Sequence, residues 1–146
     1  MTERKAAHAD LKILSHTFGV LTSELEETLR SLSVCYYEPG AVILKEGETG
    51  TNVYVALKGK CSVRKSQWIV MSKEVAQLKS GDLFGEIGFI LPTTRSASIV
   101  AVEQCEVARI VVADFKALLD RHAELRARIE EMARRRLYSL AAASQA

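Results

Sequence analysis

The spacing of apolar residues changes twice along the chain and divides it into three zones. In the first zone, residues 10–32, apolar side chains recur as they do on one face of a helix: Leu11, Leu14, Phe18 and Leu21. Ser23 followed by Glu26 is a capping-box pattern, which predicts a second short helix ending near Leu32. We therefore expect N-terminal helices over residues 10–32.

The middle zone, residues 34–112, has a β pattern. Short runs rich in Val, Ile and Tyr are separated by single glycines, which suit tight turns. In one run apolar residues alternate with their neighbours, which predicts a half-buried strand: Val53, Val55 and Leu57 against Asn52, Tyr54 and Ala56. The Lys58-Gly59 pair that follows predicts a hairpin turn. Many short strands with glycine turns are typical of a sandwich, a jelly roll or a small barrel.

The third zone begins at Asp114, a plausible N-cap, and returns to helical spacing. One stripe of side chains runs along it: Leu118, His122, Leu125, Ile129, Met132 and Leu140. We expect C-terminal helices over residues 114–141, including one long helix. The three zones together predict a single, mainly β domain over residues 1–146: an antiparallel β-roll or jelly-roll barrel with flanking helices.

Composition narrows the classes of function. Lys and Arg number 20 against 18 Asp and Glu, and this near-balance argues against a general nucleic-acid binder. No apolar run approaches the roughly 20 residues of a membrane span, and the charged N-terminus does not resemble a signal peptide. Three scattered cysteines, Cys35, Cys61 and Cys105, fit buried strand faces better than disulfides or a metal site. We expect a cytoplasmic domain without direct membrane contact, whether free or part of a membrane protein.

The residues with the clearest chemistry lie between Gly81 and Ser98. Glu86 is preceded by a glycine, and Arg95 is followed by three small residues. Glycines let backbone amides approach an anion, and a short helix after Glu86 would direct its free N–H groups at that anion. Arginine offers a planar fork of donors for two phosphate oxygens, whereas a carboxylate is better suited to accept a bond from a ribose hydroxyl. The segment therefore predicts a sugar-phosphate site.

This segment resembles the phosphate-binding cassette of the cyclic-nucleotide-binding domain family. The matching residues are Phe84, Gly85, Glu86, Gly88, Arg95, Ser96, Ala97 and Ser98. Upstream, residues 39–59 look like the glycine-turn framework of the family, with Pro39-Gly40, the run from Glu46 to Gly50, Tyr54 and Gly59. Two places depart from the common pattern: Gly88, where alanine is frequent, and Thr93-Thr94, where proline is frequent at the second position. Neither departure removes a ligand-binding group.

The resemblance implies a role for each cassette residue. Arg95 would bind the oxygens of the cyclic phosphate, and the amides of Gly88 and Ser96 would complete the anion cradle. Glu86, helped by the Gly85 backbone, would hold the ribose 2′-hydroxyl. The ligand would be cAMP or cGMP, with cAMP preferred, and no further cofactor is expected.

We expect the C-terminal helix to contact the base of the bound nucleotide and to signal binding by its movement. With about 100° per residue, Arg136 falls in the middle of the apolar stripe, where an unpaired charge is costly. In the family this helix often closes over the base, so Arg136 could stack on or bond a purine; alternatively it extends past the helix end to solvent. Val63 and Ala76 are candidates for the apolar wall around the base.

Three other functions are alternatives for a domain of this kind. A metal-centred barrel enzyme needs histidines inside the barrel, but His8, His16 and His122 all fall in helical zones, so no catalytic or metal-binding residues are predicted. A DNA-binding regulator of the catabolite-activator type carries a helix-turn-helix after the long helix, where this sequence has only about six residues, so we do not expect it to bind nucleic acid in that way. The third is a module of the same fold that has lost nucleotide binding, in which Glu86 and Arg95 form a surface ion pair. The output, whether a channel, a kinase or a partner in trans, is left open by the sequence.

Overall fold

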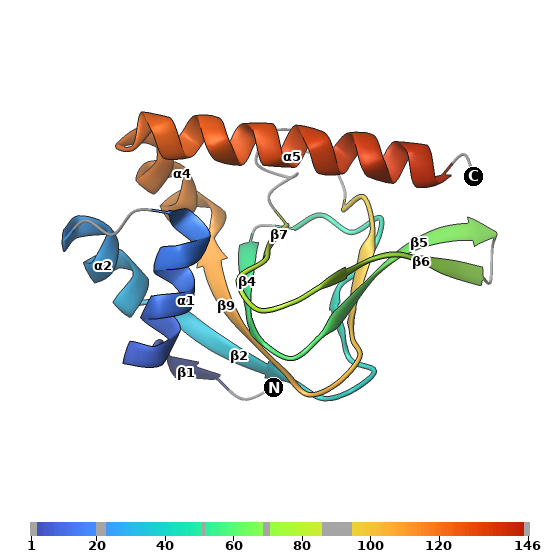
Figure 1. Cartoon of the computed structure of the whole chain (residues 1–146). Helices are drawn as coiled ribbons and strands as arrows, with labels where there is room; N and C mark the ends of the chain where they lie inside the picture. The colour runs from blue at the N-terminus through green and yellow to red at the C-terminus, as the bar shows by residue number, and fades with distance from the viewer. Residues whose placement is uncertain (1–2, 20–22, 51, 69–70, 86–94, 145–146) are drawn as a thin grey trace.

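The computed structural model describes residues 3–19, 23–50, 52–68, 71–85 and 95–144. Two antiparallel sheets form a roll, with helices packed on one side and a long helix laid across the top (Figure 1). The first sheet has the order β1 (Glu3–Lys5), β2 (Ser33–Tyr37), β9 (Cys105–Val111), β4 (Asn52–Lys58), β7 (Leu83–Phe84). The second has the order β3 (Val42–Leu44), β8 (Ser98–Ala101), β5 (Cys61–Trp68), β6 (Met71–Leu78). The predicted antiparallel β-roll with flanking helices is confirmed.

Strand β4 is buried on both faces, so the expectation of a half-buried strand is wrong. Val53, Val55 and Leu57 belong to a core that the sheet shares with the helices. Tyr54 and Ala56 point the other way, into a second core enclosed between the two sheets. An alternating pattern shows that successive side chains face opposite ways, but both faces are covered when helices pack on one and a sheet on the other.

The predicted hairpin at Lys58-Gly59 is also absent. Strand β4 pairs with β9 and β7, whereas β5 pairs with β8 and β6, so the turn carries the chain from one sheet to the other. Gly59 has a φ of 87°, and a Cβ built there would collide with the Gln104 carbonyl oxygen. The glycine is required by the close passage of the 104–105 backbone rather than by a hairpin.

Four described helices cover the first core. Helices α1 (His8–Phe18) and α2 (Ser23–Arg30) lie within the expected N-terminal zone or just before it. The expected C-terminal zone is divided, since α4 (Val112–Asp120) and α5 (Ala123–Ser144) are separated at Arg121 and His122. Helix α4 begins before Asp114, which lies in its first turn and is not the N-cap. The short helix expected after Glu86 falls in residues 86–94, outside the described part of the chain.

Helix α5 lies over the roll and is fastened to it by a short apolar row. Leu125, Ile129 and Ala133 are buried, and Met132 packs against the helix-side core. These residues follow the predicted stripe, with Ala133 added. Among the described residues, no helix has both the length and the hydropathy needed to cross a membrane.

Candidate functional site

The site begins where β7 ends. Phe84 is paired with Tyr54 across the β4–β7 ladder, and the two rings stack with centroids 5.2 Å apart. Gly85 then takes a φ of 84°, in the left-handed region that favours glycine. A Cβ at Gly85 would lie 3.0 Å from both Arg95 Nη1 and the Asn52 carbonyl oxygen. The missing side chain therefore leaves room for the arginine to pass beside the backbone.

The Arg95 guanidinium lies between two backbone carbonyls. Nη1 donates to the Gly85 carbonyl oxygen at 3.1 Å, and Nη2 donates to the Asn52 carbonyl oxygen at 2.8 Å. The side chain is half-buried. The two carbonyl oxygens accept from different ends of the guanidinium and so fix its orientation at the end of the roll.

The backbone of Arg95 is also fixed by hydrogen bonds. Its N–H donates to the Glu48 carbonyl oxygen at 2.8 Å, and its carbonyl accepts from the Gly47 N–H at 2.9 Å. Gly50 lies directly against the guanidinium, because a Cβ built on Gly50 would overlap it. The 47–50 loop thus fixes both the main chain and the side chain of the arginine.

Ser98 and Glu46 fasten the same loop to the second sheet. The Glu46 N–H donates to Ser98 Oγ at 2.9 Å, and Glu46 Oε1 accepts from the Ser66 N–H at 3.0 Å. The 46–50 loop, the 95–98 segment and β5 therefore form one hydrogen-bonded unit around Arg95.

Ser96, the residue after the arginine, is half-buried, and its carbonyl oxygen accepts a bond from Lys65 Nζ at 2.7 Å. Lys65 comes from β5, thirty-one positions earlier in the chain. It places a second cation beside the candidate phosphate site, and the sequence prediction did not include it.

The candidate wall residues lie on neighbouring strands. Val63 is buried on β5, and its partners across the ladders are Ile99 on β8 and Ala76 on β6. Directly opposed residues of an antiparallel pair share a face, so Val63 and Ala76 are side by side. Ala76 is exposed to solvent. The structure brings these two residues together, as a pocket wall requires.

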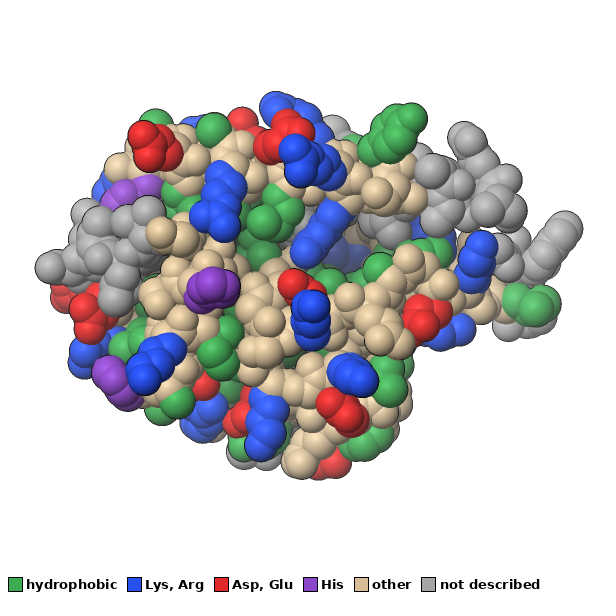
Figure 2. All heavy atoms as spheres, in the orientation of Figure 1, with side chains coloured by type: hydrophobic (Ala, Val, Ile, Leu, Met, Phe, Trp, Pro, Cys, Tyr) green, Lys and Arg blue, Asp and Glu red, His purple; other side chains and the backbone are tan. Residues whose placement is uncertain are grey.

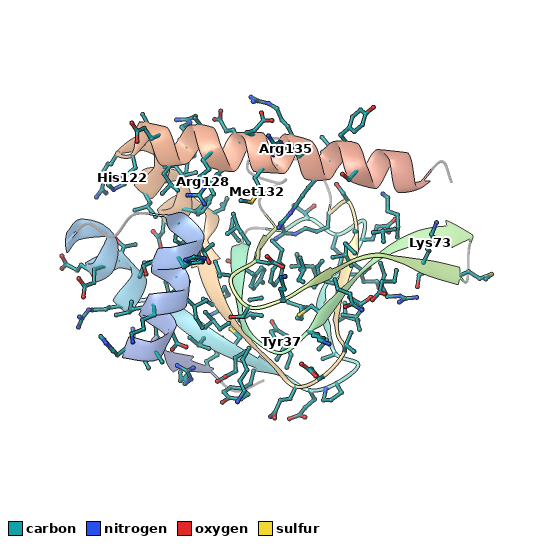
Figure 3. The ribbon with its side chains drawn as sticks, viewed as in Figure 1. Tyr37, Lys73, His122, Arg128, Met132 and Arg135 are labelled. Carbon is teal, nitrogen blue, oxygen red and sulfur yellow. The ribbon has the colours of Figure 1, made fainter. Side chains whose placement is uncertain are left out.

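Arg136 reaches down from α5 into the site region. It is half-buried, and its Nη1 donates to the carbonyl oxygen of Leu83 in β7, two residues before Gly85. The alternative in which the side chain extends past the helix end is therefore not the arrangement seen. Figure 3 shows Met132 and Arg128 on the side of α5 that faces the roll, and in Figure 2 basic side chains lie in the hollow beneath this helix.

Two predicted site residues, Glu86 and Gly88, lie outside the described residues. Of the others, the structure gathers Gly85, Arg95 and Ser96 at one end of the roll, with Arg136 fastened to the adjoining β7. Sequence reasoning overlooked Lys65 and the Asn52 carbonyl. The alternation of Cys61, Val63 and Lys65 along β5 was a signal for Lys65, but a carbonyl contact leaves no trace in side-chain identity.

The histidines lie in or beside helices, as expected. His8 and His16 are exposed on α1, and His122 lies at the α4–α5 junction. Within the described ranges, no three His, Cys, Asp or Glu side chains are grouped as metal ligands.

The known proteins to which this chain is similar point to one family. A family model described as the cyclic nucleotide-binding domain matches residues 34–122, which contain the whole candidate cassette. The cAMP-dependent protein kinase regulatory subunit of Debaryomyces hansenii is 34% identical over 110 residues, covering 75% of this chain and 23% of that protein. The cGMP-dependent protein kinase 2 of Homo sapiens is 34% identical over 90 residues, covering 61% of this chain and 12% of that protein.

Among solved structures, the Catabolite Activator Protein of Thermus thermophilus superposes with a TM-score of 0.74 and 28% sequence identity. The match covers 86% of this chain and 58% of that one. The chain spans less than a third of the length of the curated relatives it matches, with shares from 12% to 28%.

Proposed function

This chain belongs to the cyclic nucleotide-binding domain family, and we propose that it binds a 3′,5′-cyclic nucleotide at the site around Arg95. The observation that carries the proposal is the position of the Arg95 guanidinium. It is oriented by the carbonyls of Gly85 and Asn52, and its backbone is fixed by the 47–50 loop. The fork of a guanidinium matches two oxygens of an anionic phosphate.

In this proposal each cassette residue keeps the role implied by the family. Arg95 binds the equatorial and axial oxygens of the cyclic phosphate, and the amides of Ser96 and Gly88 complete the cradle. Glu86 accepts the ribose 2′-hydroxyl beside the Gly85 backbone. The half-buried position of Ser96 and the open turn at Gly85 support these assignments. No additional cofactor is part of the proposal.

We propose that the base lies against Val63 and Ala76 and is closed in by α5. The bond from Arg136 to the Leu83 carbonyl supports this, because it links α5 to the strand that leads into the cassette. A ligand that contacts both the cassette and α5 would shift the helix between a looser and a docked state, which is how binding would be signalled.

The preferred ligand in this proposal is cAMP, by a modest margin. The Ser96 hydroxyl can accept a bond from the 2-amino group of guanine, so it permits cGMP without excluding cAMP. Similar proteins include kinases named for each nucleotide.

The output is proposed to be regulatory. In the similar regulatory subunit and activator protein the family is regulatory, which supports in general terms a non-catalytic role. Three finer alternatives each depend on a further domain or protein: control of a kinase partner, control of an ion channel, and action on a partner in trans. We place the chain in the cytoplasm, since its three cysteines are free thiols.

Isothermal titration with cAMP and cGMP tests the proposal. We expect at least one of them to bind with a micromolar or lower dissociation constant. The affinity for cGMP should exceed that for cAMP by no more than about 30-fold. Arg95→Ala should weaken binding by about 2–4 kcal/mol, because a charge-assisted fork to a largely desolvated phosphate is lost. Arg95→Lys should also weaken it, since a single ammonium cannot make the paired bonds.

The matched control is Arg135→Ala, which removes an exposed arginine of α5 that pairs with Glu131. It should bind like the unchanged chain. Because Arg95 also bonds backbone carbonyls, each variant is first checked for the native circular dichroism spectrum. No heat and no rise in melting temperature with either nucleotide at millimolar concentration would instead favour an interaction module that does not bind nucleotide.

A further inference from the structure

Strand β5 presents a row of side chains to the interior of the roll, and that row includes a cation. Cys61 and Val63 are buried in the core between the sheets, and Lys65 is the next residue on the same face. Ser62 and Arg64 occupy the opposite face, where they bond Glu74 and Ser72. Lys65 therefore lies at the inner rim of the roll rather than among the outward-facing charges of the strand.

The ammonium of Lys65 is directed at the candidate phosphate site. It is half-buried and donates to the Ser96 carbonyl oxygen at 2.7 Å, directly after Arg95 in the chain. An ammonium carries three N–H donors, and this bond occupies one of them. Because the carbonyl and the amide of one residue are close together, Lys65 Nζ is within about 6 Å of the Ser96 N–H that would face the phosphate.

The residue directly opposite Lys65 on the neighbouring strand carries a charge of the same sign. Lys73 is the direct partner of Lys65 in the β5–β6 ladder, and Figure 3 shows it on the projecting part of β6. Like charges directly opposite each other destabilise an antiparallel pair. Among the described residues, no carboxylate pairs with Lys65 or Lys73. The nearby carboxylate of Glu46 accepts from the Ser66 N–H. An anion bound at Arg95 would relieve this repulsion.

We infer that Lys65 is a further ligand-binding residue, which supplies the second positive charge of the phosphate site and holds the Ser96 peptide in position. The inference rests on the proposed function, since it names an additional contact of the same site. A phosphate oxygen that accepts from the Ser96 N–H would lie about 3 Å beyond that amide. The attraction between this phosphate and the Lys65 ammonium is therefore long-range and sensitive to screening. Lys65 should therefore contribute more at low ionic strength than at high.

The test is the affinity for cAMP of Lys65→Met, Lys65→Arg and the unchanged chain, measured by titration at ionic strengths of about 0.01 M and 1 M. We expect Lys65→Met to weaken binding by about threefold to tenfold at the low ionic strength, with a smaller difference at the high one. Lys65→Arg, which keeps the charge, should bind within about threefold of the unchanged chain.

Lys60→Met is the matched control, because Lys60 is exposed beside Gly59 at the other end of β5. It removes the same charge and should leave both affinities nearly unchanged. Equal affinities of Lys65→Met and the unchanged chain at both ionic strengths would overturn the inference. A loss of affinity that is the same at both ionic strengths, together with a lowered melting temperature, would also overturn it. Failure of the unchanged chain to bind either nucleotide would overturn the proposed function itself, so the two failures are distinct.

Discussion

At the scale of single residues, Asp10 shows how one buried carboxylate fastens the start of the chain. Its side chain accepts from Arg4 Nη1 at 2.6 Å and from the Ala7 N–H at 2.7 Å, and Arg4 also pairs with Glu106 of β9. Burial acts to raise the pKa of Asp10, but the bonds from Arg4 and Ala7 outweigh it and lower the pKa below its ordinary value. The carboxylate thus joins β1, the first turn of α1 and β9.

Asp10→Asn should lower the free energy of unfolding at neutral pH by about 1–3 kcal/mol, because a charged acceptor of three bonds, two from Arg4 and one from the Ala7 N–H, is replaced by a neutral one. A carboxylate with a lowered pKa stabilises the fold above its unfolded pKa of about 3.9 and ceases to do so as pH falls through the folded value. Urea denaturation should therefore show a difference that is constant from pH 7 to about 5 and shrinks below about 4. The exposed Glu26–Arg30 pair supplies the control, since Glu26→Gln should cost less than about 0.5 kcal/mol. A difference that persists undiminished at pH 2 would refute the role assigned to the charge.

The residues that could be predicted from sequence are those whose identity carries the chemistry. Gly85 and Arg95 belong to a contiguous motif, and the structure brings them into contact. Lys65 belongs to no motif and lies thirty-one positions from Ser96, so only the pairing of β5 with β8 reveals its proximity. Non-local strand pairing is set by the packing of the whole roll, which local patterns do not encode.

At the scale of elements, the helical stripe of α5 was predictable because a period of 3.6 residues is visible in a single segment. The break at Arg121 and His122 was not, since His122 continues the apolar stripe and neither glycine nor proline marks the site. The burial of both faces of β4 could not be predicted either, because it depends on the helices that cover one face and on the second sheet that covers the other. Element type therefore followed from the pattern, while element partners did not.

In the proposed signalling, α5 moves as a unit on the end of α4, from which it is separated at Arg121 and His122. Ile129 and Ala133 are fully buried, but the helix beyond them is held by the half-buried Arg136 and Leu137, and Tyr138 is 81% exposed. Hydrogen exchange of residues about 125–140 should slow on adding cyclic nucleotide, by more than in the strands, because ligand contacts would add to the docking of α5 on the roll. Mass spectrometry of the peptides covering α5 measures this.

Arg136→Ala should remove most of that protection, since the described bond to the Leu83 carbonyl is lost, whereas Arg135→Ala should keep it. Equal exchange of α5 with and without ligand, at saturating nucleotide, would place the signalling movement elsewhere in the molecule.

At the scale of the whole molecule, two cores share the strands between them. Val55 and Ala108 face the helices, while Ala56 and Val107 on the same two strands face the interior of the roll. Strands β4 and β9 are thus common walls, and the opening of one core exposes the backs of strands that line the other. We therefore expect the two cores to unfold together, as a single cooperative unit.

The three cysteines allow this cooperativity and its link to the ligand to be tested together. Cys35, Cys61 and Cys105 are fully buried in the inner core on three strands of two sheets, with the sulfurs of Cys61 and Cys105 3.5 Å apart. Burial, with a smaller contribution from the bond to Cys105, raises the pKa of the Cys61 thiol to about 12. Since the thiolate is the reactive form, these thiols should be labelled by a disulfide reagent only when the roll opens.

Cyclic nucleotide at 100 times its dissociation constant stabilises the native state by about 2.7 kcal/mol, so all three thiols should be labelled roughly 100-fold more slowly with ligand than without. A cysteine introduced at the exposed Ser139 of α5, as Ser139→Cys, should react at once in both conditions and confirm that the reagent is active. Labelling of one buried cysteine ahead of the other two, or at a rate indifferent to bound nucleotide, would show that part of the inner core opens separately from the ligand site.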